Sequence, residues 1–208
     1  MNKTVYLYVF DTMADWEVAY LTAEIRSRRY FRKDRETLNI ITISNTMSPI
    51  TTMGGLRIMP DIPVDEFNRD DAAALVLPGG DTWMDQIHDE ILSVAERCLN
   101  NNHIVAAICG ATFGLARTGL LEKRYHTSNN LEYLKIVCPN YQGENFHKEE
   151  PAVTAENLIT ASGIAPIDFT VHVLRKLDVF QAEVLDSWEQ LYKTYDAKYF
   201  LEIMRLTQ

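Results

Sequence analysis

The chain has 208 residues, of which 47% are hydrophobic, and this suits one domain with a sizeable core better than two. Its formal net charge is −9 and its densest basic stretch, RSRRYFRKDR, is broken by aromatic residues and an aspartate, so we expect no nucleic-acid partner. No window approaches the roughly 20 apolar residues of a membrane span. Three cysteines without CxxC spacing argue against a disulfide framework or a zinc knuckle and favour a reducing, cytoplasmic setting.

The first half of the chain alternates between strand-like and helix-like segments. The N-terminal stretch TVYLYVF is predicted to be a first strand and not a signal peptide. Residues 50–63 resemble a small hairpin that turns at Gly54 and Gly55. The other predicted strands are 38–44, the apolar run of 72–81 that Pro-Gly-Gly ends, and 103–109, and the predicted helices are 14–28 and 89–102.

The second half continues with a helix at 111–121, which we expect to close near Gly119, and with a short helix or strand at 133–139. Residues 151–163 contain two strand-like runs around a turn at Glu156 and Asn157. Residues 164–177 form an amphipathic helix with Pro166 in its first turn, and the tail is helical by pattern.

Apolar strands without surface-type alternation, separated by helices, predict an α/β fold. We expect a doubly wound, flavodoxin-like, mostly parallel sheet with helices on both faces. Residues 1–208 are predicted to form one domain, with a helical C-terminal extension from about residue 178.

The segment IVAAICGATFG places Cys109 where a predicted strand ends and a helix begins. The free amides and dipole of such a helix start favour thiolate over thiol, and Gly110 suits the sharp turn of a nucleophile elbow. The Gly79–Gly80 loop can bring N–H groups beside the sulfur, so we expect Gly80 and Gly110 to form an oxyanion hole. The alternative is that Cys109 is an inert, buried apolar residue.

Four segments, FDTMADWE, LVLPGGD, AAICGATFGLARTGLL and NLITASG, together resemble the ThiJ/PfpI superfamily up to about Leu177. That superfamily has the class I glutamine amidotransferase-like fold and includes deglycase-like stress proteins and intracellular proteases. The resemblance implies that Cys109 is the elbow cysteine and that Glu17 is the acid beside it. We expect Glu17 to titrate abnormally and to donate to the thiolate when protonated, and we assign Asp15 to helix capping.

The sequence departs from the superfamily at its histidines. Gly110 stands where protease-like members carry histidine, and Asn129 stands at the position of another family histidine. His126, three residues earlier, is a weak candidate for the catalytic base. Gly79, Thr127 and Asn129 are candidates for contact with substrate.

The remaining polar residues suggest no further site. His88, His103, His147 and His172 lack metal-ligand spacing, and the acids of 65–71 fit a solvated loop, so we expect no metal. The glycine pairs lack the patterns of nucleotide-binding loops, so no cofactor is expected. Trp83 is expected to line the mouth of a pocket or to cap the core.

The leading hypothesis is a cysteine-dependent hydrolase, protease-like, amidase-like or deglycase-like, that acts on a small-molecule or peptide substrate. One alternative is a redox-sensing or stress-response protein in which Cys109 is oxidised without turnover. Another is a partner-binding module with a vestigial site. The resemblance also implies a possible homodimer, although the apolar stripe of the tail is better explained by packing on its own sheet.

Overall fold

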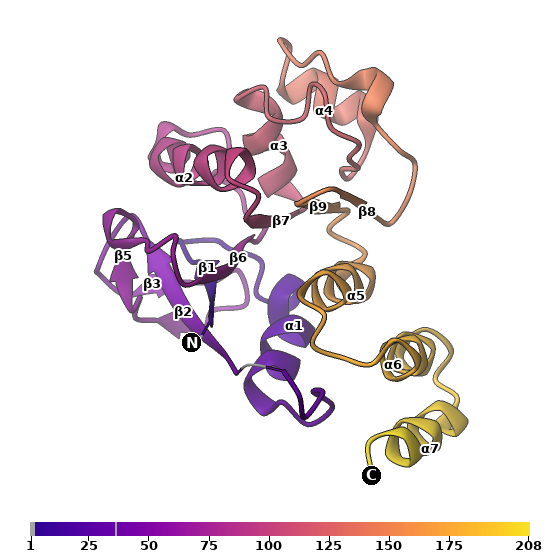
Figure 1. The fold of residues 1–208 in the computed structure, drawn as a ribbon. Coiled ribbons are helices and arrows are strands. Elements are labelled where there is room, and N and C mark those ends of the chain that lie inside the picture. The colour runs from indigo at the N-terminus through magenta and orange to yellow at the C-terminus, as the bar shows by residue number, and fades with distance from the viewer. Residues whose placement is uncertain (1–2, 36) are drawn as a thin grey trace.

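The computed structural model describes residues 3–35 and 37–208. Its centre is a seven-stranded sheet with the order β5-β2-β1-β6-β7-β9-β8 (Figure 1). All neighbouring strands are parallel except β8, which runs antiparallel to β9. The strands of this sheet are β1 (Lys3–Tyr8), β2 (Leu38–Ser44), β5 (Ile62–Pro63), β6 (Ala72–Leu77), β7 (Ile104–Ile108), β8 (Ala152–Ala155) and β9 (Leu158–Ala161). The predicted doubly wound, mostly parallel α/β fold is therefore confirmed.

Helices cover both faces of this sheet. On one face α1 (Trp16–Ser27) and α5 (Pro166–Leu177) contact each other and the strands, and on the other α2 (Asp89–Asn100) and α3 (Gly110–Arg117) contact β7. The central strands β6 and β7 are almost wholly buried, which explains why their sequences, AAALVL and IVAAI, do not alternate. Their carboxyl ends lead directly into the Pro-Gly-Gly loop and Cys109, as the sequence predicts.

The hairpin predicted at 50–63 is only partly right. Strands β3 (Ile50–Thr51) and β4 (Arg57–Ile58) pair around Gly55, whose φ of +84° suits glycine, but β5 leaves the hairpin and joins β2 in the main sheet. The capping role of Asp15 is wrong. Its side chain makes no cap hydrogen bond, and Oδ2 instead accepts from Thr52 Oγ1 at 2.5 Å and from the Gly54 amide at 2.9 Å. Asp15 therefore ties the hairpin to the start of α1.

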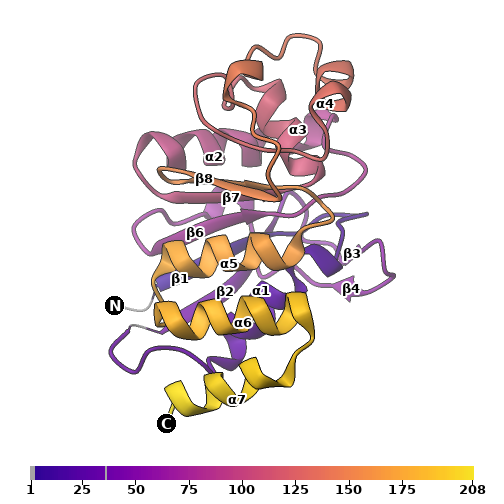
Figure 2. The same ribbon diagram turned by 90° about the vertical axis from the view of Figure 1, so that its right-hand side faces the viewer.

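The other helices resolve what the sequence left open. The segment 133–139, which was predicted to be either a short helix or a strand, begins within helix α4 (Leu131–Val137). The N-cap residue of this helix, Asn130, accepts a hydrogen bond from the Tyr133 amide. The predicted helical tail is two helices, α6 (Ala182–Thr194) and α7 (Ala197–Leu206), because Tyr195 adopts φ +60° between them. Figure 2 shows α5, α6 and α7 in successive rows on one side of the sheet. Within the described residues, short 3-10 turns lie at Val64–Glu66, Gln86–His88 and Glu144–Phe146.

Trp188 joins α6 to α1. It is fully buried, and its indole N–H donates to Glu24 Oε1 at 2.9 Å, while Arg29 forms an ion pair with the same carboxylate. Glu24 is itself 1% exposed, so this contact satisfies a buried charge of the helix that also carries Glu17.

We propose that α6 and α7 unfold together with the sheet as one domain, and Trp188→Ala tests this. The substitution is expected to lower the free energy of unfolding by about 3–5 kcal/mol, because it empties a large core site. Trp188→Phe keeps most of the packing and is expected to cost about 1–2 kcal/mol through the lost hydrogen bond. Urea unfolding followed by circular dichroism provides the measurement. A separate early transition in the parent, with the main transition unmoved by Trp188→Ala, would contradict the proposal.

Candidate active site

Cys109 occupies a strained turn between β7 and α3. Its backbone adopts φ +58° and ψ −125°, a conformation that costs energy for a residue with a side chain. The turn is held on both sides, because the Cys109 amide donates to Ala161 O at 3.0 Å and its carbonyl accepts from the Thr112 amide at 3.0 Å. This geometry is that of a nucleophile elbow, in which the side chain projects from the carboxyl edge of the sheet.

Glycines pack directly against the sulfur. A Cβ atom added to Gly79 would lie 2.6 Å from Cys109 Cβ and 2.7 Å from Glu17 Oε2. One added to Gly163 would lie 2.7 Å from Cys109 Sγ and 3.1 Å from Glu17 Oε1. One added to Gly110 would lie 2.8 Å from Gly80 O. Any larger residue at these positions would therefore push against Cys109, the Glu17 carboxylate or the loop beside them.

Glu17 lies on α1, is fully buried and faces the elbow. Its Oε2 accepts from the Gly79 amide at 2.6 Å, whereas Oε1 is buried without a hydrogen-bond partner among the described residues. Burial raises the pKa of Glu17 from 4.5 to about 7, although the Cys109 thiol and the Gly79 amide act in the opposite direction. The expected abnormal titration of Glu17 agrees with this shift, and near neutral pH the side chain can both take and give a proton.

The raised pKa of Glu17 predicts a pH-dependent stability. The folded chain keeps a proton that the unfolded chain releases, so this contribution to stability is present below pH 4.5 and is lost as the pH rises through about 7. The loss amounts to about 3 kcal/mol for a shift of this size. Between pH 5 and pH 8, the free energy of unfolding of the parent should therefore fall by about 2 kcal/mol more than that of Glu17→Gln.

Urea titrations of both proteins at the two pH values give this difference directly. Burial lowers the pKa of His88 and of His126 to about 4, so these groups destabilise the fold as the pH falls below 6.5. Both proteins contain them, and their effect cancels in the comparison. Parallel pH dependences of the parent and Glu17→Gln would show that Glu17 is ionised near its usual pKa.

The expectation of a stabilised Cys109 thiolate is wrong in sign. Burial raises the pKa of Cys109 to about 11, and the charge of Glu17 raises it further, whereas the Asn129 side chain and the Gly110 amide lower it. The Asn129 side chain and the Gly110 amide therefore do not compensate for the lost hydration of the thiolate and the nearby Glu17. A thiol whose pKa is raised in this way needs a nearby proton acceptor in order to react.

Asn129 contacts the sulfur directly. Its Nδ2 donates to Cys109 Sγ at 3.2 Å, while Oδ1 accepts from the Gly163 amide at 2.8 Å and lies 3.5 Å from Ser162 Oγ. The two donors on Oδ1 fix the orientation of the amide, so the NH₂ group faces the sulfur. Asn129 thus sits beside Cys109 as an uncharged donor that cannot serve as a base.

The structure does not place His126 at the sulfur. Its Nδ1 is 2.6 Å from Arg124 O and its Nε2 is 2.5 Å from Tyr141 Oη, so both ring nitrogens are occupied elsewhere. Thr127 is likewise engaged, because Oγ1 donates to Glu150 O and its amide donates to Thr160 Oγ1, each at 2.8 Å. The Gly79 amide is taken by Glu17. The site geometry therefore gives no support to His126 as base or to Thr127 and Gly79 as substrate ligands.

A cavity of about 550 Å³ opens onto these groups. Its walls come from the N-terminal ends of α1 and α5, the elbow and the loop after β9, and they consist of Trp16, Glu17, Cys109, Asn129, Ser162, Gly163, Ile164 and Pro166. Sequence reasoning did not single out Trp16, Gly163, Ile164 or Ser162. The sequence did contain an indication of these residues. NLITASG, like PGGD and CGAT, lies at the carboxyl end of a parallel strand, and ligand sites in such sheets lie at these strand ends.

Trp83 belongs to the core and not to the mouth of this cavity. It is 1% exposed, and its indole N–H donates to Pro78 O at 2.8 Å, which braces the Pro-Gly-Gly loop. Among residues 3–35 and 37–208 there is no group of three or more His, Cys, Asp and Glu side chains that could hold a metal ion. In the same residues, no helix has the length and apolar content needed to cross a membrane.

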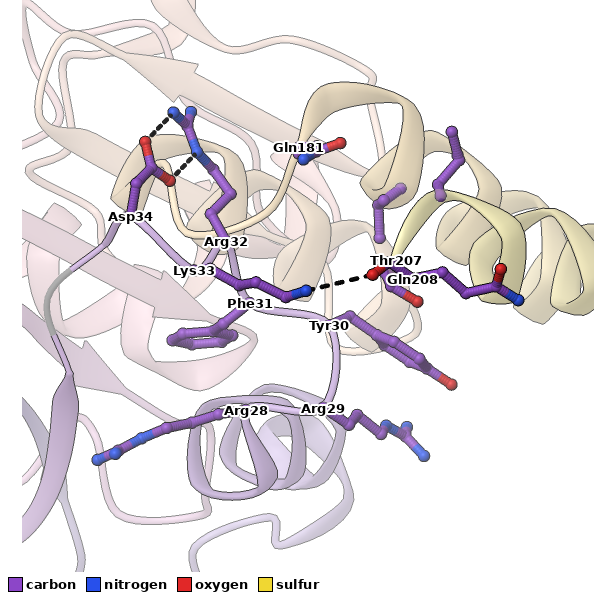
Figure 3. A pocket seen from close by; sticks show the side chains of 12 residues that line it. Arg28, Arg29, Tyr30, Phe31, Arg32, Lys33, Asp34, Gln181, Thr207 and Gln208 are labelled. Atoms are coloured by element: carbon purple, nitrogen blue, oxygen red, sulfur yellow. Dashed lines mark hydrogen bonds and ion pairs between the residues drawn. The ribbon is translucent and has the colours of Figure 1, made fainter.

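A second cavity of about 480 Å³ lies between residues 28–34 and the ends of α6 and α7 (Figure 3). Its wall contains much of the basic stretch, but these side chains already have partners. Arg32 binds Asp34 and Asp178, and Lys33 Nζ donates to Gln208 O at 3.2 Å. The wall contains no cysteine, serine or histidine among the described residues, so the Cys109 cavity is the better candidate for chemistry.

Comparison with known proteins agrees with the fold. The model of the DJ-1/PfpI family matches residues 3–176. A Bacillus subtilis protein named uncharacterized protease YoaZ is 52% identical over 203 residues, which are 98% of this chain and 97% of that protein. Uncharacterized protease YdeA, also from Bacillus subtilis, is 34% identical over 192 residues, 90% of this chain and 89% of the relative.

Two solved structures extend the similarity to three dimensions. A ThiJ/PfpI family protein from Bacillus anthracis has a TM-score of 0.95 and 52% identity, over 99% of this chain and 97% of that one. The DJ-1 superfamily protein Atu0886 from Agrobacterium tumefaciens has a TM-score of 0.81 and 31% identity, over 93% of this chain and 98% of that one.

Proposed function

The chain belongs to the DJ-1/PfpI family, and from this premise we propose that it is a cysteine-dependent hydrolase acting on a carbonyl carbon bonded to nitrogen. Amides and peptides have that bond, and we include the adducts of methylglyoxal with amines, in which the nitrogen is bonded to the carbon next to the carbonyl. The observation that carries the proposal is the pair formed by half-buried Cys109 and buried Glu17, in which the acid has a pKa of about 7 and its Oε1 has no hydrogen-bond partner other than the thiol. The names of the two Bacillus relatives, which call them proteases, are consistent with it.

One proton acceptor suffices for the reaction. The Glu17 carboxylate takes the thiol proton as Cys109 Sγ bonds to the carbonyl carbon, and the amides of Gly80 and Gly110 stabilise the oxyanion. Glu17 then returns the proton to the departing nitrogen, and water releases the covalent intermediate with Glu17 again accepting a proton. A carboxyl group with a pKa near the working pH is efficient in both directions. The missing histidine is therefore no obstacle.

The test measures turnover and the covalent intermediate together. Parent protein is offered aryl amides, peptides and methylglyoxal-modified Nα-acetyllysine, and intact mass spectrometry follows the adduct on Cys109. Cys109→Ser is expected to lose at least about 10³-fold in turnover, since the hydroxyl is a much weaker nucleophile. Cys98→Ala, which removes a buried thiol from α2, is the matched control. Undiminished turnover in Cys109→Ser, or no turnover by the parent on any of the three classes, would refute the proposal.

Oxidation of Cys109 is a second candidate function, favoured by the groups around the sulfur. A protonated Glu17 and the Asn129 amide both have hydrogens to donate to the oxygens of a sulfinic acid at this position. Peroxide treatment followed by peptide mass spectrometry distinguishes the two. Selective formation of sulfinate at Cys109, without turnover on any of the substrates, would favour redox sensing.

A further inference from the structure

The cavity at Cys109 carries little charge. Apart from Glu17 and Cys109, its walls are Trp16, Asn129, Ser162, Gly163, Ile164 and Pro166, and no lysine, arginine or histidine is found among these described residues. Glu17 is fully buried, and apart from the neighbouring Cys109 thiol its Oε1 has no hydrogen-bond partner among the described wall residues. An unsatisfied buried oxygen beside a reactive sulfur indicates a position at which a ligand, by its own polar group, completes the site.

The walls farther from the sulfur are apolar and exposed. Trp16 is 47% exposed and Ile164 is 94% exposed, although side chains of this size are usually covered. Trp16 begins α1 and Pro166 begins α5, and these two helices lie side by side (Figure 1). An aromatic ring, a branched alkyl group and a proline thus face one opening, an arrangement that suits an apolar substituent.

The surroundings also disfavour a negatively charged substituent. An adjoining cavity of about 350 Å³ shares Asn129, Ser162 and Ile164 with the first and adds the acidic residues Glu149, Glu150 and Asp168. Its described lining residues likewise include no lysine, arginine or histidine.

From this arrangement we propose that the site selects carbonyl compounds that carry an uncharged aryl or branched alkyl group, and that Trp16 and Ile164 determine this selectivity. The inference rests on the proposed reaction at Cys109 and narrows its substrate class. The carbonyl lies at the sulfur between Glu17 and Asn129, and the apolar group lies between Trp16 and Ile164. Compounds with a carboxylate next to the carbonyl are disfavoured, because the described lining residues include no cationic side chain to pair with that charge.

Alkylation of Cys109 tests the selectivity without requiring turnover. The probes are iodoacetanilide, iodoacetamide and iodoacetate, which present an aryl group, a small neutral group and a carboxylate. Each rate at Cys109 is divided by the rate of the same reagent with a free, uncharged thiol. Iodoacetanilide is expected to react about tenfold faster than iodoacetamide on this scale, and iodoacetate about tenfold slower. A roughly tenfold change in rate is the size of effect that contact with one apolar group, or repulsion of one charge, typically produces.

Two variants assign the effect to the residues. Trp16→Ala should remove most of the preference for iodoacetanilide. Ile164→Lys, at a fully accessible position, should raise the relative rate of iodoacetate several-fold, whereas Leu201→Lys adds the same charge to the exposed face of α7 and should not. Equal normalised rates for the three reagents, or a preference that neither variant changes, would overturn the inference. The two proposals can fail separately. If Cys109-dependent turnover is observed, the proposed reaction holds even when the selectivity is absent. If no turnover is observed, the measured selectivity of alkylation still holds.

Discussion

Replacing Glu17 with glutamine is expected to change the two activities of Cys109 in opposite directions. Turnover should fall by about 10²–10⁴-fold, because glutamine cannot accept the thiol proton or return it to the leaving group. Alkylation at pH 8.5 should instead become about tenfold faster, since the carboxylate charge beside the sulfur disappears and the pKa of Cys109 falls. Burial still holds that pKa above the usual range for cysteine, so the alkylation rate should keep rising beyond pH 9.

Both quantities can be measured on one preparation of each protein. Peptide mass spectrometry gives the rate of modification at Cys109 between pH 6 and pH 10, with Cys98 and Cys138 as internal references. Glu24→Gln is the matched control, because it removes the other buried acid of α1 without touching the cavity. If alkylation and turnover of Glu17→Gln fall together, Glu17 acts as a protonated donor that stabilises the thiolate, and its role as proton acceptor is excluded.

The sequence predicted the sheet well because its central strands are buried on both faces. Continuous apolar runs such as 72–77 and 104–108 have no stable position except the middle of a covered parallel sheet. The seven-residue α4 was ambiguous, because a short apolar run has no clear period. The Asp15 error has a different origin. The sequence cannot say that a hairpin 37 residues away offers a hydroxyl and an amide that compete for the same carboxylate.

The residues of the candidate site that belong to sequence motifs could be predicted. Cys109 and Glu17 stand in motifs that fix their positions at strand and helix ends, and the structure brings them together. The sign of the Cys109 pKa shift was not predictable from the sequence. Burial of the sulfur raises the pKa and hydrogen bonds from nearby amides lower it, and their balance depends on the three-dimensional structure. Ile164 and Gly163 were missed because their loop follows the last strand of the parallel set, far in sequence from the elbow.

Gly163→Ala is expected to suppress the reactivity of Cys109 by at least about 10²-fold while the fold survives. The added methyl group would lie 2.7 Å from Cys109 Sγ and 2.9 Å from its Cβ, which is too close for either atom to remain in place. Overpacking of this kind typically costs about 1–3 kcal/mol of stability, less than a domain of this size has available. The new group also lies 3.1 Å from Glu17 Oε1, so it crowds both members of the proposed pair.

The measurement combines alkylation rates with urea unfolding, so that loss of reactivity is separated from loss of structure. Gly55→Ala is the control. Its φ of +84° strains the backbone of any residue other than glycine, but no atom lies within 4 Å of the added Cβ, so the substitution causes no steric clash. It should lose a comparable amount of stability and keep the parent rate at Cys109. If Gly163→Ala folds and reacts at the parent rate, the sulfur has space to move aside, and the close packing of Gly163 does not control the reactivity of Cys109.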